Sequence, residues 1–162
     1  MKLIIVEGSN GVGKTTLLKK IRDRYDVFYV HFPLVYYRKM PAVAYLGEML
    51  SFLRGQLGVF VDLNARPILV DRFFLSTMVY QNKDVNFISP VLEELSKHEY
   101  YLFVLKPDEK YKRVISQFDN IKTYDDPNAL ENAITFILNR WSNGNDEGLN
   151  KASVANFSKG VI

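Results

Sequence analysis

The sequence predicts an α/β fold, a three-layer sandwich in which a parallel sheet of four or five strands is covered by helices on both faces. Short apolar runs alternate along the chain with segments of helical spacing, which is typical of parallel strands joined by right-handed crossovers. The first run, residues 3–6, is apolar throughout, as expected of a strand buried on both faces. A glycine-rich turn and a helical pattern follow it directly.

The elements are expected in a regular order along the chain. The predicted strands are residues 3–6, 27–30, 67–71 and 100–105. The predicted helices are a first one through residues 17–21, then 41–54, 73–81, one opened by Pro90, 108–117, and a last one starting near residue 127. Because the carboxyl ends of parallel strands meet at one edge, we expect Glu7, His31, Asp71 and Lys106 along that edge.

Composition limits the chemistry. With 162 residues, 48% of them hydrophobic, the chain is long enough for one domain with a real core. It has no cysteine, which excludes disulfides, thiolate metal sites and a cysteine nucleophile, and its two histidines argue against a zinc site.

Charge and hydropathy point to a soluble protein. The formal charge of +3 suits both an ordinary solvated surface and a site for anionic ligands, so it does not separate the two. No stretch approaches the ~20 apolar residues of a membrane span, and Glu7 interrupts the apolar start of the chain. We therefore expect a cytoplasmic protein without a membrane partner.

Residues 8–15 match the pattern G-x-x-x-x-G-K-[ST] without a mismatch, which predicts a phosphate-binding P-loop and a P-loop NTPase-type fold. The glycines allow successive N–H groups to point inward at phosphate oxygens, and the following helix adds its positive dipole end. Lys14 would neutralise the β and γ phosphates, and Thr15 would bind Mg²⁺. The expected cofactors are ATP and Mg²⁺, and the expected nucleotide contacts are Gly8, Ser9, Asn10, Gly11, Val12, Gly13, Lys14, Thr15 and Thr16.

A second cluster follows the third predicted strand. Asp71 ends that strand, where its carboxylate could hold Mg²⁺ together with Thr15. Arg72 could bind an acceptor phosphate through two parallel hydrogen bonds. In a helix, Ser76 and Tyr80 share one face, and with Gln81 nearby they could recognise the hydrogen-bonding edge of a base.

These residues resemble the thymidylate kinase family, in the order Asp71-Arg72-Phe73, Ser76-Thr77 and Tyr80-Gln81. Glu7-Gly8 is also similar to that family, as are, more loosely, Phe32-Pro33, Arg38 and Gly47-Glu48. The resemblance covers the first half of the chain and thins out after Leu105. It implies a pyrimidine deoxynucleotide acceptor, for which the expected substrate-binding residues are Glu7, Phe32, Arg38, Arg72, Ser76, Tyr80 and Gln81.

The chain departs from the family pattern in its arginines. Gly11 stands where the P-loop arginine of that family could sit, and the segment of residues 110–122, in the position of the family's lid, has Arg113 as its one arginine. The positive charge that stabilises phosphoryl transfer is then expected to come from Arg38, Arg72 or residues 110–122. The expected catalytic residues are Lys14, Asp71, Arg72, Arg38 and Arg113. The chain is either a trimmed member, as compact viral genomes encode, or one whose pocket has opened to another acceptor.

Three functions follow from these features. The leading one is ATP-dependent transfer to a (deoxy)pyrimidine nucleoside monophosphate by a kinase domain over residues 1–141. The second is a kinase for a nucleoside or for a hydroxymethylated pyrimidine base, with DNA as the less favoured partner. The third is a non-catalytic ATP-binding regulatory module. Residues 142–162 are expected to form a polar tail that is either flexible or completes an adenine pocket. The sequence is also compatible with a homodimer.

Overall fold

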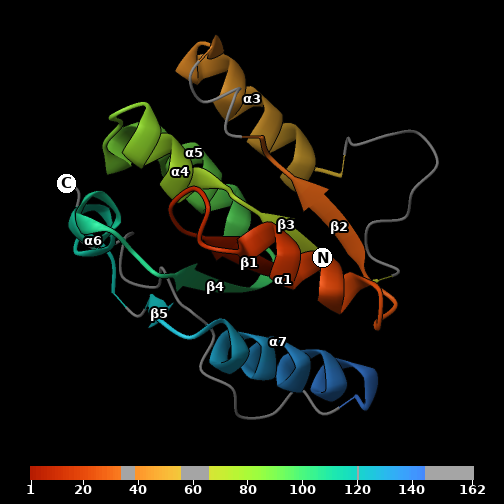
Figure 1. Cartoon of the computed structure of the whole chain (residues 1–162). Coiled ribbons are helices and arrows are strands. Elements are labelled where there is room, and N and C mark those ends of the chain that lie inside the picture. The colour runs from red at the N-terminus through yellow and green to blue at the C-terminus, as the bar shows by residue number, and fades with distance from the viewer. Residues whose placement is uncertain (34–38, 56–65, 120, 145–162) are drawn as a thin grey trace.

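The computed structural model describes residues 1–33, 39–55, 66–119 and 121–144. Its centre is a five-stranded sheet in which all pairs are parallel and the order is β2-β3-β1-β4-β5 (Figure 1). The strands are β1 (Lys2–Glu7), β2 (Phe28–His31), β3 (Ile68–Asp71), β4 (Glu99–Leu105) and β5 (Lys122–Tyr124). The predicted parallel sheet is confirmed, and its fifth strand lies ahead of the last helix.

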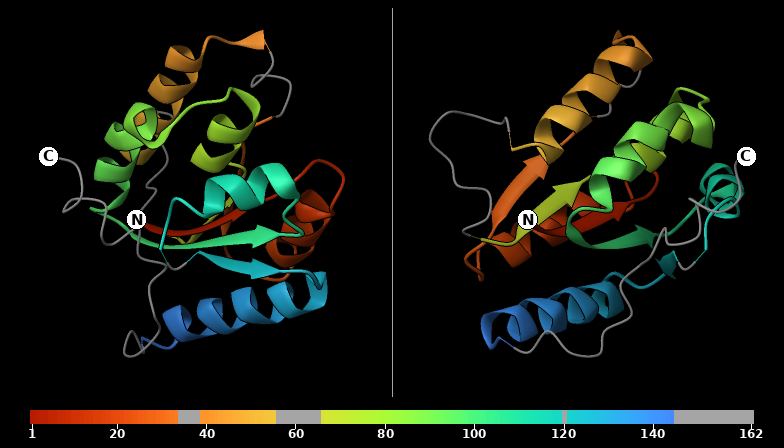
Figure 2. Two further views of the ribbon diagram at one scale, coloured as in Figure 1. Left: turned by 90° about the vertical axis from the view of Figure 1, so that its left-hand side faces the viewer. Right: turned by 180° about the vertical axis from the view of Figure 1, so that it is seen from behind.

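Helices cover both faces of the sheet, as Figure 2 shows. They are α1 (Lys14–Arg22), α3 (Ala42–Leu53), α4 (Phe74–Tyr80), α5 (Val85–Leu95), α6 (Glu109–Ile115) and α7 (Pro127–Ser142). Alternate residues of β1 enter opposite cores: Leu3 and Ile5 pack with α3 to α6, while Ile4 and Val6 pack with α1 and α7. The three-layer sandwich is therefore confirmed. Among the helices of the described ranges, none has the length and apolar character that a membrane span requires.

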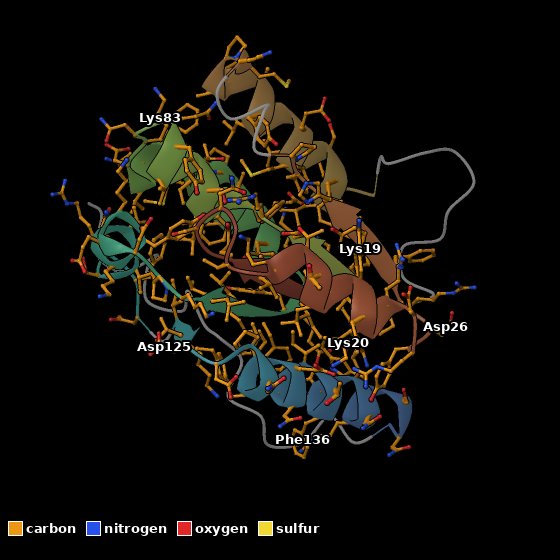
Figure 3. All side chains as sticks on the ribbon, viewed as in Figure 1. Lys19, Lys20, Asp26, Lys83, Asp125 and Phe136 are labelled. Carbon is orange, nitrogen blue, oxygen red and sulfur yellow. The ribbon has the colours of Figure 1, made fainter. Side chains whose placement is uncertain are left out.

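The layer of α1 and α7 is also joined by polar contacts at its surface. Lys20 of α1, labelled in Figure 3, donates to Glu131 of α7 at 2.9 Å. Arg24 donates to the same carboxylate. Both basic side chains are largely exposed, so these ion pairs contribute little to stability. The buried apolar faces of the two helices hold this layer on the sheet.

The start of α5 differs from its prediction. Pro90 was expected to open this helix, but the helix begins at Val85 and is capped by Asp84, whose carboxylate accepts from the Phe87 N–H at 3.0 Å. A proline inside a helix removes the hydrogen bond to the carbonyl four residues earlier, here that of Asn86. The Ser89 hydroxyl donates to that carbonyl at 3.0 Å and replaces the missing bond.

The segment of residues 110–122, expected in the position of a lid, is split between a helix and a strand. Asp108 caps α6 by accepting from the Tyr111 N–H, and Tyr111, Val114 and Phe118 are buried in the core beside α4. Lys122 begins β5 instead of ending a lid. These buried side chains fix α6 to the body of the protein.

Candidate functional site

The carboxyl ends of the strands place the predicted edge residues together. Glu7 ends β1, His31 ends β2 and Asp71 ends β3, while Lys106 follows β4 directly. The register sets Val6 and His31 beside Asp71 on the two neighbouring strands. The sequence prediction for this edge is confirmed.

The loop of residues 8–13 leads from β1 into α1 with the backbone that a phosphate-binding loop requires. Gly8, Gly11 and Gly13 all have positive φ angles, of 141°, 77° and 97°. Gly13 is the N-cap of α1 and offers no side chain, so no side-chain hydrogen bond caps the helix. The first N–H groups of α1 are thus available to an anion, which the helix dipole also favours.

Lys14 lies across this loop. Its side chain is buried at 4% exposure, and Nζ donates to the Ser9 carbonyl at 2.6 Å. Burial, together with the nearby charge of Arg72, lowers the pKa of Lys14 to about 8, against opposing effects of Asp71 and Glu7. An anion bound in the loop would favour the charged form of Lys14 and raise its pKa, because the negative charge would lie near Nζ.

Asp71 accepts three hydrogen-bond donors on one carboxylate oxygen. Oδ2 lies 2.5 Å from Thr15 Oγ1, 2.9 Å from the Tyr29 hydroxyl and 3.0 Å from His31 Nδ1. Burial raises the pKa of Asp71, but the hydrogen bonds from His31, Thr15 and Tyr29 outweigh it, so the pKa is below its usual range. The carboxylate is therefore ionised at neutral pH.

The residues at this point fit a bound Mg²⁺. The other oxygen of Asp71, Oδ1, is buried and has no hydrogen-bond partner, and a hard cation prefers such an anionic oxygen. Thr15 supplies a hydroxyl at Oδ2 of the same carboxylate. Within the described ranges, no group of three or more His, Cys, Asp and Glu side chains gathers around a common point. Thr15 and Asp71 would thus hold the ion together with nucleotide phosphates, as Mg²⁺ usually is held.

Arg72 is placed beside the loop by an unusual backbone. Its φ is 69°, its exposure is 3%, and its N–H donates to the Val6 carbonyl at 3.0 Å. The guanidinium donates to the Gly8 carbonyl at 3.2 Å and lies over the Tyr80 ring, 5.5 Å from its centre. Left-handed backbone in a residue other than glycine is strained and is concentrated at functional sites. Arg72 thus lies at the loop with Tyr80 beside it, and the role of both in binding an acceptor stays a prediction.

Glu7 and Ser76 have partners inside the protein. Glu7 is fully buried and caps α4, with Oε1 accepting from the N–H groups of Phe73 at 2.8 Å and Leu75 at 2.9 Å. Burial raises the pKa of Glu7, against the lowering effects of the Ser76 hydrogen bond and of the Arg72 charge. The Ser76 hydroxyl donates to Glu7 Oε2 at 2.5 Å and lies 2.9 Å from the Tyr111 hydroxyl. In this arrangement both predicted substrate contacts face the interior instead of a base.

The remaining predicted residues are scattered. Phe32 is 8% exposed and packs at the edges of the Phe52 and Phe73 rings in the core, instead of stacking on a base. Gln81 donates to the Met40 carbonyl at 3.1 Å, and its Oε1 is buried without a partner. Arg113 is exposed on α6. Arg38 lies outside the described residues.

Two tyrosines that the sequence pattern did not single out contact residues of the site. Tyr29 binds Asp71, and Tyr111 binds Ser76. His31, which had no assigned role, lies at Asp71 as well. The period of two along a strand puts Tyr29 and His31 on one face, but only the strand order places that face against Asp71.

A cavity of about 650 Å³ lies at the opposite end of the sheet. It is lined mainly by polar side chains at the amino ends of β1 and β4 and the end of α7, among them Lys2, Glu99 and Ser142. It contains none of the predicted site residues.

The parallel sheet and the loop between β1 and α1 define a P-loop NTPase fold. No protein-family model matches the chain, and no curated protein matches it. Among solved structures, it is similar to the YorR protein of Bacillus subtilis in complex with phosphorylated GDP, with a TM-score of 0.60, 15% identity, and coverage of 87% of this chain and 98% of that one. It is also similar to thymidylate kinase from Ehrlichia chaffeensis, with a TM-score of 0.53, 20% identity, and coverage of 85% and 98%. At these identities the likeness establishes the fold.

Proposed function

We propose that this protein is an ATP-dependent kinase that phosphorylates a (deoxy)pyrimidine nucleoside monophosphate. The observation that carries the proposal is the juxtaposition of the P-loop lysine, the ionised Asp71 and the buried Arg72 at one edge of the sheet. A lysine and an arginine beside the same loop, at the Ser9 and Gly8 carbonyls, suit a reaction between two phosphate groups. The resemblance of residues 71–81 to thymidylate kinases, and the fold shared with one, support the choice of acceptor.

In the proposed reaction the donor phosphates lie in the loop of residues 8–15. An oxygen of the acceptor monophosphate attacks the γ-phosphorus in line, the new P–O bond forms, and the bond to the bridging β–γ oxygen breaks to release ADP. Lys14 stabilises charge on the donor phosphates, and Arg72 orients the acceptor phosphate. A Mg²⁺ ion held at Thr15 and Asp71 would supply further neutralisation of phosphate charge.

A transfer assay tests this function. The purified chain is incubated with Mg²⁺ and γ-labelled ATP and with each of a panel of nucleoside monophosphates, nucleosides and hydroxymethylated DNA. We expect a labelled diphosphate from a pyrimidine monophosphate. Transfer of the label to a nucleoside or to DNA instead would show that the acceptor is not a monophosphate. Tight ATP binding without transfer to any acceptor would show that the protein is a non-catalytic binding module.

Replacing Arg72 by alanine is expected to raise the KM for the acceptor monophosphate by about 10- to 100-fold, because a charged hydrogen bond contributes about 1.5–3 kcal/mol. The KM for ATP should stay within about threefold of its original value. Initial rates at varied acceptor and ATP measure both. Arg72→Lys should recover part of the loss, because lysine keeps the positive charge but cannot donate two parallel hydrogen bonds. Arg54→Ala, which removes an exposed ion pair, serves as the control. An unchanged acceptor KM in Arg72→Ala would contradict this role.

Nucleotide binding is expected to weaken above pH 8. Binding requires the charged form of Lys14, whose pKa of about 8 in the free protein leaves roughly a tenth of the molecules charged at pH 9. The Kd for ATP should therefore rise about tenfold from pH 7 to pH 9, as measured by calorimetry. Lys14→Arg, which stays charged, should lack this rise, and a flat wild-type profile would refute the assignment.

The same pKa has the opposite consequence for the stability of the ligand-free protein. The folded state binds fewer protons at Lys14 than the unfolded state between pH 8 and the ordinary lysine value of 10.5. The free energy of unfolding therefore increases as the pH rises from about 8 to 10.5. It decreases again as the pH falls through the same window, and the contribution is gone at about pH 8.

A further inference from the structure

The three donors recorded around Asp71 all meet the same oxygen of its carboxylate. Tyr29 and His31 are two residues apart on β2, so their side chains leave the strand on the same face, and their rings stack at 6.4 Å with 7° between their planes. Both point at Oδ2, which also accepts from Thr15. The strand next to β3 thus presents two fixed donors to one oxygen of this carboxylate.

The two oxygens of Asp71 consequently have unequal capacity. An ionised carboxylate oxygen offers about two acceptor positions, and Oδ2 already serves three donors. Oδ1 serves none, although it is buried. Only Oδ1 retains the lone pairs that a cation needs.

Metal ions differ in how they use carboxylates. Ca²⁺ takes six to eight oxygen ligands at about 2.3–2.6 Å and readily accepts both oxygens of one carboxylate, whereas Mg²⁺ requires six ligands in a near-ideal octahedron. A carboxylate with one usable oxygen satisfies an octahedral ion and deprives a larger ion of a bidentate ligand. The number and geometry of the oxygen ligands therefore set the ratio of the affinities for the two ions.

We propose that Tyr29 and His31 are positioning residues that restrict Asp71 to a single metal-facing oxygen and thereby select Mg²⁺ over Ca²⁺. The inference rests on the metal site of the proposed function. Neither side chain touches the ion: each acts through Oδ2, Tyr29 from a half-buried position and His31 from the more exposed end of the strand.

The test measures metal affinity in the ADP complex of the full chain. MgCl₂ and CaCl₂ are each titrated by calorimetry into ADP-saturated protein, for the original chain, for Tyr29→Phe, for His31→Leu and for the double variant. We expect the preference for Mg²⁺ over Ca²⁺ to fall at least tenfold in the double variant and by less in each single one. Outer partners of metal ligands typically change affinity by about 10- to 100-fold.

Two further variants separate positioning from mere structural support. His31→Asn keeps an N–H donor near the place of Nδ1 and should restore most of the preference that His31→Leu loses. Tyr25→Phe removes a hydroxyl from a tyrosine that follows α1 and packs on the same core as Tyr29, and it should leave the preference unchanged because the donors to Asp71 are Thr15, Tyr29 and His31. An unaltered Mg²⁺/Ca²⁺ ratio in the double variant overturns the proposal, even if both affinities fall together.

Failure of this inference and failure of the proposed function give different results. The titrations need ADP and metal only, so a shifted ratio without phosphoryl transfer in the original chain would reject the kinase and keep the selection mechanism. Phosphoryl transfer to a monophosphate, together with an unaltered Mg²⁺/Ca²⁺ affinity ratio in the variants, would keep the kinase and reject the selection mechanism.

Discussion

Lys14→Ala is expected to lower kcat/KM for phosphoryl transfer by roughly 100- to 1000-fold, the loss typical of removing one preorganised charge-stabilising group. Lys14 is the buried cation of the loop and already crosses it to reach the Ser9 carbonyl. Among the described residues the other buried cation beside the loop is Arg72, which serves the acceptor phosphate in the proposed reaction and so does not replace Lys14 at the donor phosphates. Initial rates over a range of ATP and acceptor concentrations measure the loss.

A neighbouring lysine provides the matched control for this variant. Lys19 lies on the same helix but is exposed, away from the loop (Figure 3). Lys19→Ala should keep the original rate to within about twofold, because it removes a solvated charge. A Lys14→Ala protein that is folded and transfers phosphate at the original rate would remove the P-loop from the mechanism.

Gly8→Ala is expected to destabilise the protein by about 2–5 kcal/mol. The φ of 141° disfavours a side chain, and a Cβ at this position would lie 2.3 Å from the Leu105 carbonyl oxygen, which belongs to the backbone of β4. Neither strand can move easily, because β1 and β4 are paired along their whole common length. Urea unfolding, extrapolated to water, measures the loss.

A second glycine tests whether the effect is local. Gly47 lies exposed inside α3, and a Cβ there would meet nothing within 4 Å. Gly47→Ala should therefore stabilise the protein by about 0.5–1 kcal/mol through helix propensity. Equal unfolding free energies for the two alanine variants would show that the contact of Gly8 with Leu105 is not tight in solution.

Much of the fold could be predicted because its signals are local. A strand buried on both faces appears as a continuous apolar run, as in residues 3–6, and the P-loop is a contiguous motif between such a run and a helix. The parallel arrangement then places Asp71 near Thr15 although 56 positions separate them. Pro90 misled the prediction because a proline usually opens a helix, and here a serine hydroxyl compensates for it inside one.

The partners of the site residues could not be predicted in the same way. Helical spacing puts Ser76 and Tyr80 on one face, but whether Ser76 meets a ligand or Glu7 depends on how α4 packs against β1. Tyr29 reaches Asp71 only because β2 is the neighbour of β3. Strand order and helix packing are long-range properties, which periodicity within one segment does not contain.

The buried hydrogen bonds from Glu7 through Ser76 to Tyr111 have a consequence for how substitutions at these positions combine. The three residues come from β1, α4 and α6, and each satisfies a polar group of the next. Loss of one leaves a buried partner unsatisfied, at a cost of about 1–3 kcal/mol. We therefore expect a substitution at one of these three positions to cost more free energy of unfolding than its share of a matched substitution at all three.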